Sequence, residues 1–223
     1  MNKFYQKHKV FQWSIAILLF ILVLLLYGLW YWSLSIHLTY ILLLPIMAPI
    51  MQFALTPFFT LIGSYKYLSP MLLVFNPTNT KYDLHNGTSF DYLMVLSHSK
   101  MGSALKNQIL QYYLLGLLKI IEDIENQKLP DTLEISGSSY FFSARTAKNL
   151  GFNISNATIA EKTNILFNYL DLLWMYSIAN GRLRFPNLNQ VKKANITGAD
   201  LIKNKSKFEQ LYIYLNKKSA SIS

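Results

Sequence analysis

Two long apolar runs without a charged residue dominate the start of this chain. The first covers residues 14–34 and the second covers residues 38–62. About 20 apolar residues in a helix, at a rise of 1.5 Å per residue, match the roughly 30 Å hydrocarbon core of a bilayer. The few residues between the runs, ending with His37, leave room only for a tight turn. The sequence therefore predicts a transmembrane helical hairpin within residues 1–64.

The second run is less regular than the first because it contains Pro45, Pro49 and Pro57. A proline inside a helix removes a backbone donor and tends to kink the helix. Neighbouring helices make this tolerable in a membrane. We expect a bent second helix that either crosses the bilayer fully or runs partly along its interface. Neither run carries an Asp, Glu, Lys or Arg, which favours an anchor over an ion or proton pathway.

Positive charge flanks the predicted hairpin and is absent from its turn. Lys3, Lys7 and Lys9 precede the first run, and Lys66 follows the second. Because cytoplasmic flanks of membrane helices are enriched in lysine and arginine, both chain termini are predicted to be cytoplasmic. These four lysines are the predicted contacts with the membrane surface. A cleaved signal peptide is the alternative, but the first run exceeds the roughly 7–15 residues of a signal core and a second run follows it at once.

The rest of the chain has the composition of a soluble domain. We expect one cytoplasmic domain over residues 65–218 and a disordered tail over residues 219–223. The element order indicates an α+β fold, a short sheet with helices packed on it. Predicted strands cover residues 71–75, 82–85, 88–96, 132–136 and 152–155, and predicted helices cover residues 103–127, 143–150, 158–180 and 199–217.

Two details of this prediction rest on local patterns. Asn86-Gly87 is the dipeptide best suited to a tight hairpin turn, so the strands on either side of it are predicted to pair. In the helix over residues 158–180, we expect Leu166, Tyr169, Leu170 and Leu173 to point inward.

The charge balance and the absence of cysteine narrow the classes of partner. The net charge is +10, and beside membrane helices a basic domain fits anionic lipid headgroups better than nucleic acid. The lipid bilayer is thus the expected partner, with a protein partner or a homo-oligomer as further possibilities. Without cysteine there are no disulfides, thiolate metal sites or cysteine nucleophiles. No sequence motif indicates a cofactor or a metal ion.

The first candidate site comprises Asp83, His85 and Asp91. Residues two apart on a strand project to the same face, so Asp83 can orient His85 as a general base. The alternative is ordinary turn chemistry, because Asp, Asn, Gly, Thr and Ser are the residues that turns favour.

The second candidate site is an anion-binding loop with Ser138, Ser139 and Arg145. A Gly/Ser loop between a strand and the start of a helix presents free N–H groups to an anion, and Arg145 would add a bidentate contact. The loop lacks a P-loop or dinucleotide signature, so a plain helix cap is the alternative.

These features leave two hypotheses about function. The first is a membrane-anchored interaction module that uses its basic domain at the bilayer surface. The second is a membrane-associated enzyme acting on a lipid-linked or phosphorylated substrate. The enzyme hypothesis predicts that His85, Asp91, Ser139 and Arg145 converge around one concavity.

Overall fold

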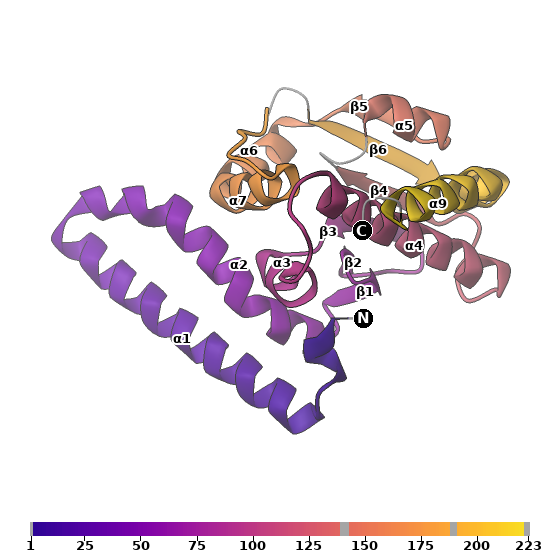
Figure 1. Cartoon of the computed structure of the whole chain (residues 1–223). Helices are drawn as coiled ribbons and strands as arrows, with labels where there is room; N and C mark the ends of the chain where they lie inside the picture. The colour runs from indigo at the N-terminus through magenta and orange to yellow at the C-terminus, as the bar shows by residue number, and fades with distance from the viewer. Residues whose placement is uncertain (1, 139–142, 188–190, 221–223) are drawn as a thin grey trace.

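A helical hairpin projects from a small domain in the computed structural model, which describes residues 2–138, 143–187 and 191–220 (Figure 1). A short 3-10 helix, η1 (Lys3–Gln6), precedes α1 (Lys9–Ile36), and η2 (Leu38–Leu43) leads into α2 (Leu44–Leu61). The arms Lys9–Ile36 and Leu38–Leu61 are both long and apolar enough to span a membrane. The predicted pair of apolar helices is therefore confirmed.

The prolines affect the second arm unequally. Pro45 lies in the first turn of α2, where a missing backbone N–H costs nothing. Pro49 and Pro57 lie inside the helix, and each removes one backbone hydrogen bond. The arm also begins with six residues of 3-10 helix, η2, rather than α-helix.

A mixed α+β domain follows the hairpin, as predicted. Its strands are β1 (Tyr65–Ser69), β2 (Leu72–Phe75), β3 (Lys81–Asn86), β4 (Glu134–Ser138), β5 (Asn153–Asn156) and β6 (Lys192–Thr197). Its helices are α3 (Ser89–Leu96), α4 (Ser103–Glu125), α5 (Ala144–Asn149), α6 (Ile159–Phe167), α7 (Tyr169–Asn180), α8 (Gly198–Lys203) and α9 (Lys205–Ala220). The described strands form one sheet in the order β1-β2-β3-β4-β6-β5, in which β3 and β4 are parallel and the other neighbours are antiparallel.

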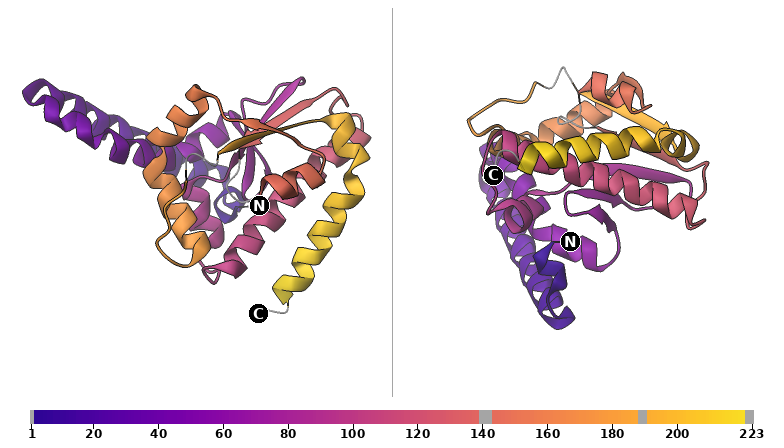
Figure 2. Two further views of the ribbon diagram at one scale, coloured as in Figure 1. Left: turned by 90° about the horizontal axis from the view of Figure 1, so that it is seen from above. Right: turned by 45° about the vertical axis from the view of Figure 1, so that its right-hand side comes forward.

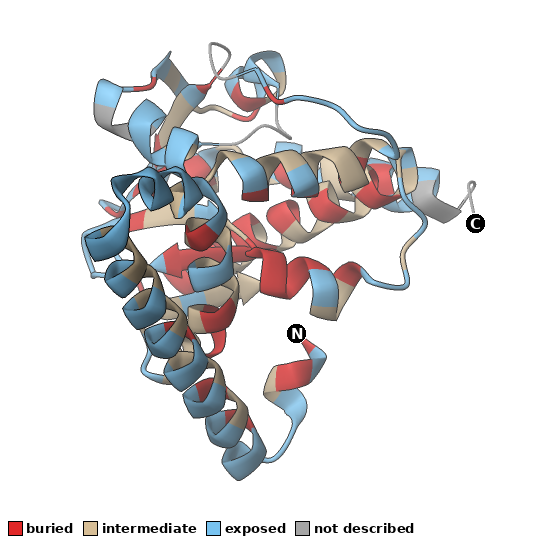
Figure 3. Ribbon diagram, turned by 90° about the vertical axis from the view of Figure 1, so that its left-hand side faces the viewer, coloured by how far each residue is buried: buried red, intermediate tan, exposed pale blue. Residues whose placement is uncertain are grey.

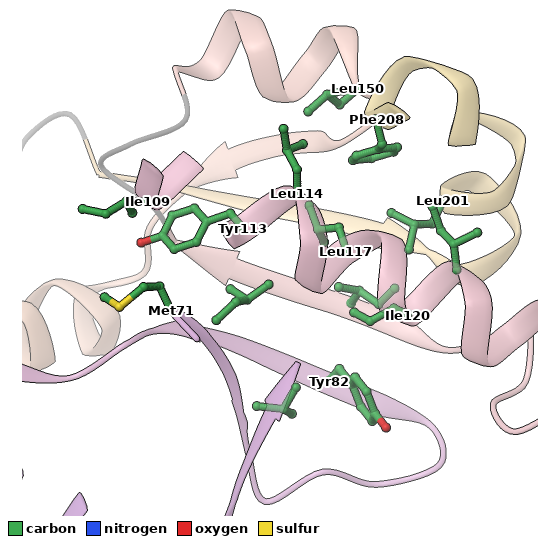
Figure 4. Packing of buried hydrophobic residues seen from close by; sticks show 14 of the residues in the cluster. Met71, Tyr82, Ile109, Tyr113, Leu114, Leu117, Ile120, Leu150, Leu201 and Phe208 are labelled. Carbon is green, nitrogen blue, oxygen red and sulfur yellow. The ribbon is translucent and has the colours of Figure 1, made fainter. Parts of the chain in front are cut away.

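Helix α4 packs against one face of this sheet, and α9 packs beside α4 (Figure 2). The apolar face of α4 supplies much of the core, and Leu114, Leu117 and Ile120 meet Tyr82 of β3 and Phe208 of α9 there (Figure 4). The helix approaches the sheet closely at Gly116, where a Cβ atom would lie 2.6 Å from Leu72 Cδ2.

The predicted hairpin at Asn86-Gly87 is wrong, because residues 89–96 form α3 rather than a strand. Gly87 does not have the positive φ that the predicted turn requires. Its Cβ atom would instead meet Met71 Cε at 2.8 Å, so Gly87 serves close packing. Asp91 accepts a hydrogen bond from the Thr88 N–H at 2.9 Å, as the acidic residue of a capping box does. The sequence here fits both a turn and the start of a helix, and in the structure it starts a helix.

The helix predicted over residues 158–180 also differs in two ways. It is broken at Asn168 into α6 and α7. The predicted inward face is wrong in part, since Leu166 is 59% exposed and Leu170 is 39% exposed. The buried residues of α7 are Asp171, Met175 and Ala179.

Strands β1 and β6 were not predicted, and both are largely polar in sequence. In the tail, Ser219 and Ala220 continue α9, whereas residues 221–223 lie outside the described part of the chain.

Candidate functional site

A small polar pocket lies at the carboxyl ends of the two parallel strands, β3 and β4. Ligands of open α/β sheets commonly bind at such strand ends. The pocket has a volume of about 230 Å³ and also borders β6, α6, α7 and the second arm of the hairpin. Its described polar lining consists of Gln52, Asp83, His85, Asn86, Ser138, Asn164, Asn168, Asp171 and Lys193.

The register of the sheet explains why so many polar side chains meet here. Asp83 lies opposite Ser136, and Ser138 lies opposite Lys193. Side chains alternate between the two faces of a sheet, so these residues and His85 share one face. The opposite face carries apolar residues such as Ile135 that pack against the helices.

Asp83 and His85 form the pair that their spacing predicted. His85 Nε2 lies 3.4 Å from Asp83 Oδ2, and Ser136 Oγ donates to Asp83 Oδ1 at 3.2 Å. The hydrogen bond with His85 lowers the pKa of Asp83. Both side chains are about half exposed to solvent, at 45% for His85 and 50% for Asp83. An accessible imidazole oriented by a carboxylate is the arrangement of a general base.

Asp171 is a second carboxyl group of the pocket, which sequence reasoning missed. It is 4% exposed, and burial raises its pKa to about 6, against a smaller opposing effect of the Ser89 hydroxyl. A carboxyl group with a pKa near the working pH can transfer protons. The available signal was an acidic residue inside the apolar stretch of residues 169–175.

Asp91 lies apart from this pocket and is fully buried. Its carboxylate accepts hydrogen bonds from Asn2 Nδ2 at 3.0 Å and Tyr67 Oη at 2.7 Å. The N–H and the hydroxyl of Thr88 also donate to it, at 2.9 and 3.1 Å. Burial nevertheless raises the pKa of Asp91. With no exposed surface and four donors around it, Asp91 is placed to hold the structure together rather than to touch a substrate.

The residues of the predicted anion site are not brought together in the described part of the chain. Ser138 borders both the polar pocket and a neighbouring cavity of about 840 Å³. Arg145 is exposed on α5 and lines neither of them, and Ser139 lies outside the described residues. The described lining of the larger cavity includes the cations Lys106, Arg184 and Lys192 as well as apolar residues.

The four predicted surface lysines lie at the domain end of the hairpin. Lys3, Lys7 and Lys9 are exposed and lie in η1, between η1 and α1, and at the start of α1, respectively. Lys66 lies on β1, where its ammonium donates to Tyr82 Oη at 2.9 Å and lies 5.3 Å from the centre of the Tyr82 ring. The opposite end of the hairpin, around His37, carries no lysine or arginine.

Among the described residues, no three His, Asp or Glu side chains are placed to hold a metal ion. Comparisons of the chain with protein-family models, with curated proteins and with solved structures find no match. The geometry above therefore carries the functional argument.

Proposed function

We propose that this protein is a membrane-anchored interaction module whose hairpin inserts into a bilayer and holds the basic domain at the bilayer surface. The observation that carries this proposal is that the hairpin is apolar and exposed, while buried polar contacts connect its base to the domain. Many apolar residues of the arms are exposed (Figure 3). Exposed apolar area on this scale is unfavourable in water and favourable in lipid.

Buried contacts connect the anchor to the domain at several points. From the N-terminal side, Asn2 donates to Asp91, and Phe4 packs against Phe90 with ring centres 5.3 Å apart. From the second arm, Thr56 Oγ1 donates to Thr88 Oγ1 at 3.0 Å in a buried contact. The segment before the hairpin and its second arm thus converge on the start of α3. Such an anchor fixes the orientation of the domain, which a flexible tether does not.

In this proposal both termini lie on the same side of the bilayer, and the flanking lysines favour the cytoplasm for that side. A reporter fused after Ser223 tests this placement, and we expect it to be active only in the cytoplasm. The membrane fraction should retain the protein after alkaline extraction. Release by alkali would contradict insertion, and a reporter active on the opposite side would contradict the orientation.

A second candidate function is catalysis at the polar pocket on a phosphorylated or lipid-linked substrate. The specific observation in its favour is that the Asp83–His85 pair borders the same cavity as Asp171, whose pKa is raised to about 6. In this proposal His85 acts as the general base and Asp83 orients it, while Asp171 supplies or takes up a proton. Asp91 and Arg145 have no part in it.

Turnover of p-nitrophenyl phosphate and of a short-chain phosphatidic acid by the purified full chain tests this second candidate. We expect a His85→Gln variant to lose at least about 100-fold of any activity found, since general-base groups contribute about 10²–10⁴-fold. His98, which lies outside the pocket, provides the matched control His98→Gln. Equal activity of the two variants would remove His85 from any mechanism.

A further inference from the structure

Four large apolar side chains on α6 and α7 keep a substantial part of their surface exposed in the described chain. These are Ile159, Leu166, Leu170 and Trp174, here called the α6–α7 stripe, and each is more than a third exposed. The neighbouring Phe167 is 49% exposed. An amphipathic helix normally turns such residues inward. Here α7 buries Asp171, Met175 and Ala179 instead.

The stripe belongs to helices that lie directly beside the anchor. Helices α6 and α7 both contact α2, and Figure 1 shows them above the middle of that helix. Gln52 of α2 borders the polar pocket together with residues of both helices. The stripe therefore lies on helices that border the second arm of the hairpin.

The length of the hairpin gives an independent reason to place this surface in lipid. From residue 52 onward the second arm packs on the domain, because Gln52 borders the pocket and Phe53 packs against Phe90 with ring centres 5.5 Å apart. Only residues 38–51 project clear of the domain. About 14 residues with a rise of 1.5–2.0 Å each span about 20–25 Å, which is less than the roughly 30 Å of a hydrocarbon core.

A hairpin whose free part is this short cannot reach the far side of a bilayer while the domain stays in water. Either its tip stops inside the bilayer or the domain sinks to meet the lipid. In both cases the elements that flank α2 come to the level of the headgroups. Trp174 is suited to that depth because its ring is amphipathic, and the exposed Arg182 and Arg184 that follow α7 suit anionic headgroups.

We propose that the α6–α7 stripe is a second membrane contact, which lies in the lipid interface beside the hairpin. This inference rests on the proposed membrane anchorage. The domain is then partly embedded, with the polar pocket close to the headgroups. A second copy of the chain is the competing occupant of the stripe, and the experiment below separates the two.

Single cysteines test the proposal cleanly because the chain has no cysteine of its own. Leu166→Cys probes the stripe and Phe167→Cys the residue beside it. Leu24→Cys probes the hairpin, and Ile213→Cys on α9 is the matched exposed control. Each full-length variant is labelled with an environment-sensitive fluorophore. It is then reconstituted into vesicles of phosphatidylcholine with a minority of phosphatidylglycerol, with or without spin-labelled lipids that quench at shallow or deep positions.

We expect quenching at positions 24, 166 and 167 and little at position 213. At positions 166 and 167 the shallow quencher should be the stronger, because interfacial helices lie about 5–10 Å into the headgroup boundary. If position 24 is quenched but 166 and 167 behave like 213, the stripe does not contact lipid and the anchor stands. If no position is quenched, the anchor itself is refuted. A blue shift at 166 and 167 without quenching would indicate a protein cover, and would also overturn the proposal.

Discussion

Helices α1 and α4 are both long and rich in apolar residues, yet they face opposite surroundings. Helix α1 has 28 residues, of which only Gln12, Ala16 and Val23 are buried. Helix α4 has 23 residues, and eleven of them are buried. Helix α1 has no charged residue after Lys9, whereas α4 has five, Lys106, Lys119, Glu122, Asp123 and Glu125. Helix length alone does not distinguish a core helix from an anchor. Mean hydropathy and charge do, because among the described helices only the two hairpin arms are apolar enough to span a membrane.

We expect the largest effect of a single substitution at the buried contacts between the hairpin and the domain. Asp91→Ala leaves the donors of Asn2, Tyr67 and Thr88 buried without their acceptor, and should lower the free energy of unfolding by about 3–5 kcal/mol. Equilibrium denaturation of the full chain in mild detergent measures this loss.

Asp200 provides a control for helix capping alone. It caps α8 with Thr197 at an exposed site, where Thr197 Oγ1 donates to its carboxylate at 2.9 Å. Asp200→Ala should cost about 0.5–2 kcal/mol, as other lost caps do. Equal losses for the two variants would mean that Asp91 only caps α3 and does not join the regions.

Truncation of one leucine in each helix compares α4 with α1 directly. Leu114 in α4 is fully buried, and Leu114→Ala should cost about 2–5 kcal/mol through lost burial and a cavity. Leu24 in α1 is 56% exposed, so Leu24→Ala should change the stability in detergent by less than about 0.5 kcal/mol. The same denaturation assay measures both variants. A large loss at Leu24 would show that a protein surface covers the hairpin.

The buried carboxyl group of the pocket makes a smaller, pH-dependent prediction. The pKa of Asp171 rises from 3.8 to about 6 on folding, so the folded protein binds more protons than the unfolded chain between these pH values. Its stability should therefore fall as the pH rises from about 4 to 6 and stay low above that range.

Asp171→Asn removes this effect, because the amide stays neutral at every pH in that range. The variant should be more stable than the natural chain by about 1–3 kcal/mol at pH 8 and by much less at pH 4. Melting curves at the two pH values check this. A gain of the same size at both would show that the charge of Asp171 is not the cause.

Much of the fold was predictable because it depends on local patterns. The uncharged runs indicated the two apolar helices, and the helical spacing of Leu114, Leu117 and Ile121 is typical of a core face such as the one α4 presents. A serine just before a helix is a typical N-cap, and the Ser143 hydroxyl accepts from the Thr146 N–H at 3.0 Å at the start of α5. The pair of Asp83 and His85 followed from the alternation of a strand.

The errors arose where two local patterns compete or where the partner is distant. Asn86-Gly87 fits a hairpin turn, and Thr88 with Asp91 fits a helix start; only packing against Met71 and the hairpin decides between them. Strands β1 and β6 form because their backbones pair with neighbouring strands. Their polar side chains give no sequence signal of that pairing.

By itself, the sequence determined that this chain has a bare apolar hairpin and a basic α+β domain, because charge and periodicity act along the chain. Tertiary structure alone decided three other features. It joined Asn2 to Asp91 across most of the N-terminal region, it gathered Asp171 beside Asp83 and His85, and it turned the apolar face of α6 and α7 outward. Each of these depends on distant segments meeting, and no spacing along the chain encodes that meeting.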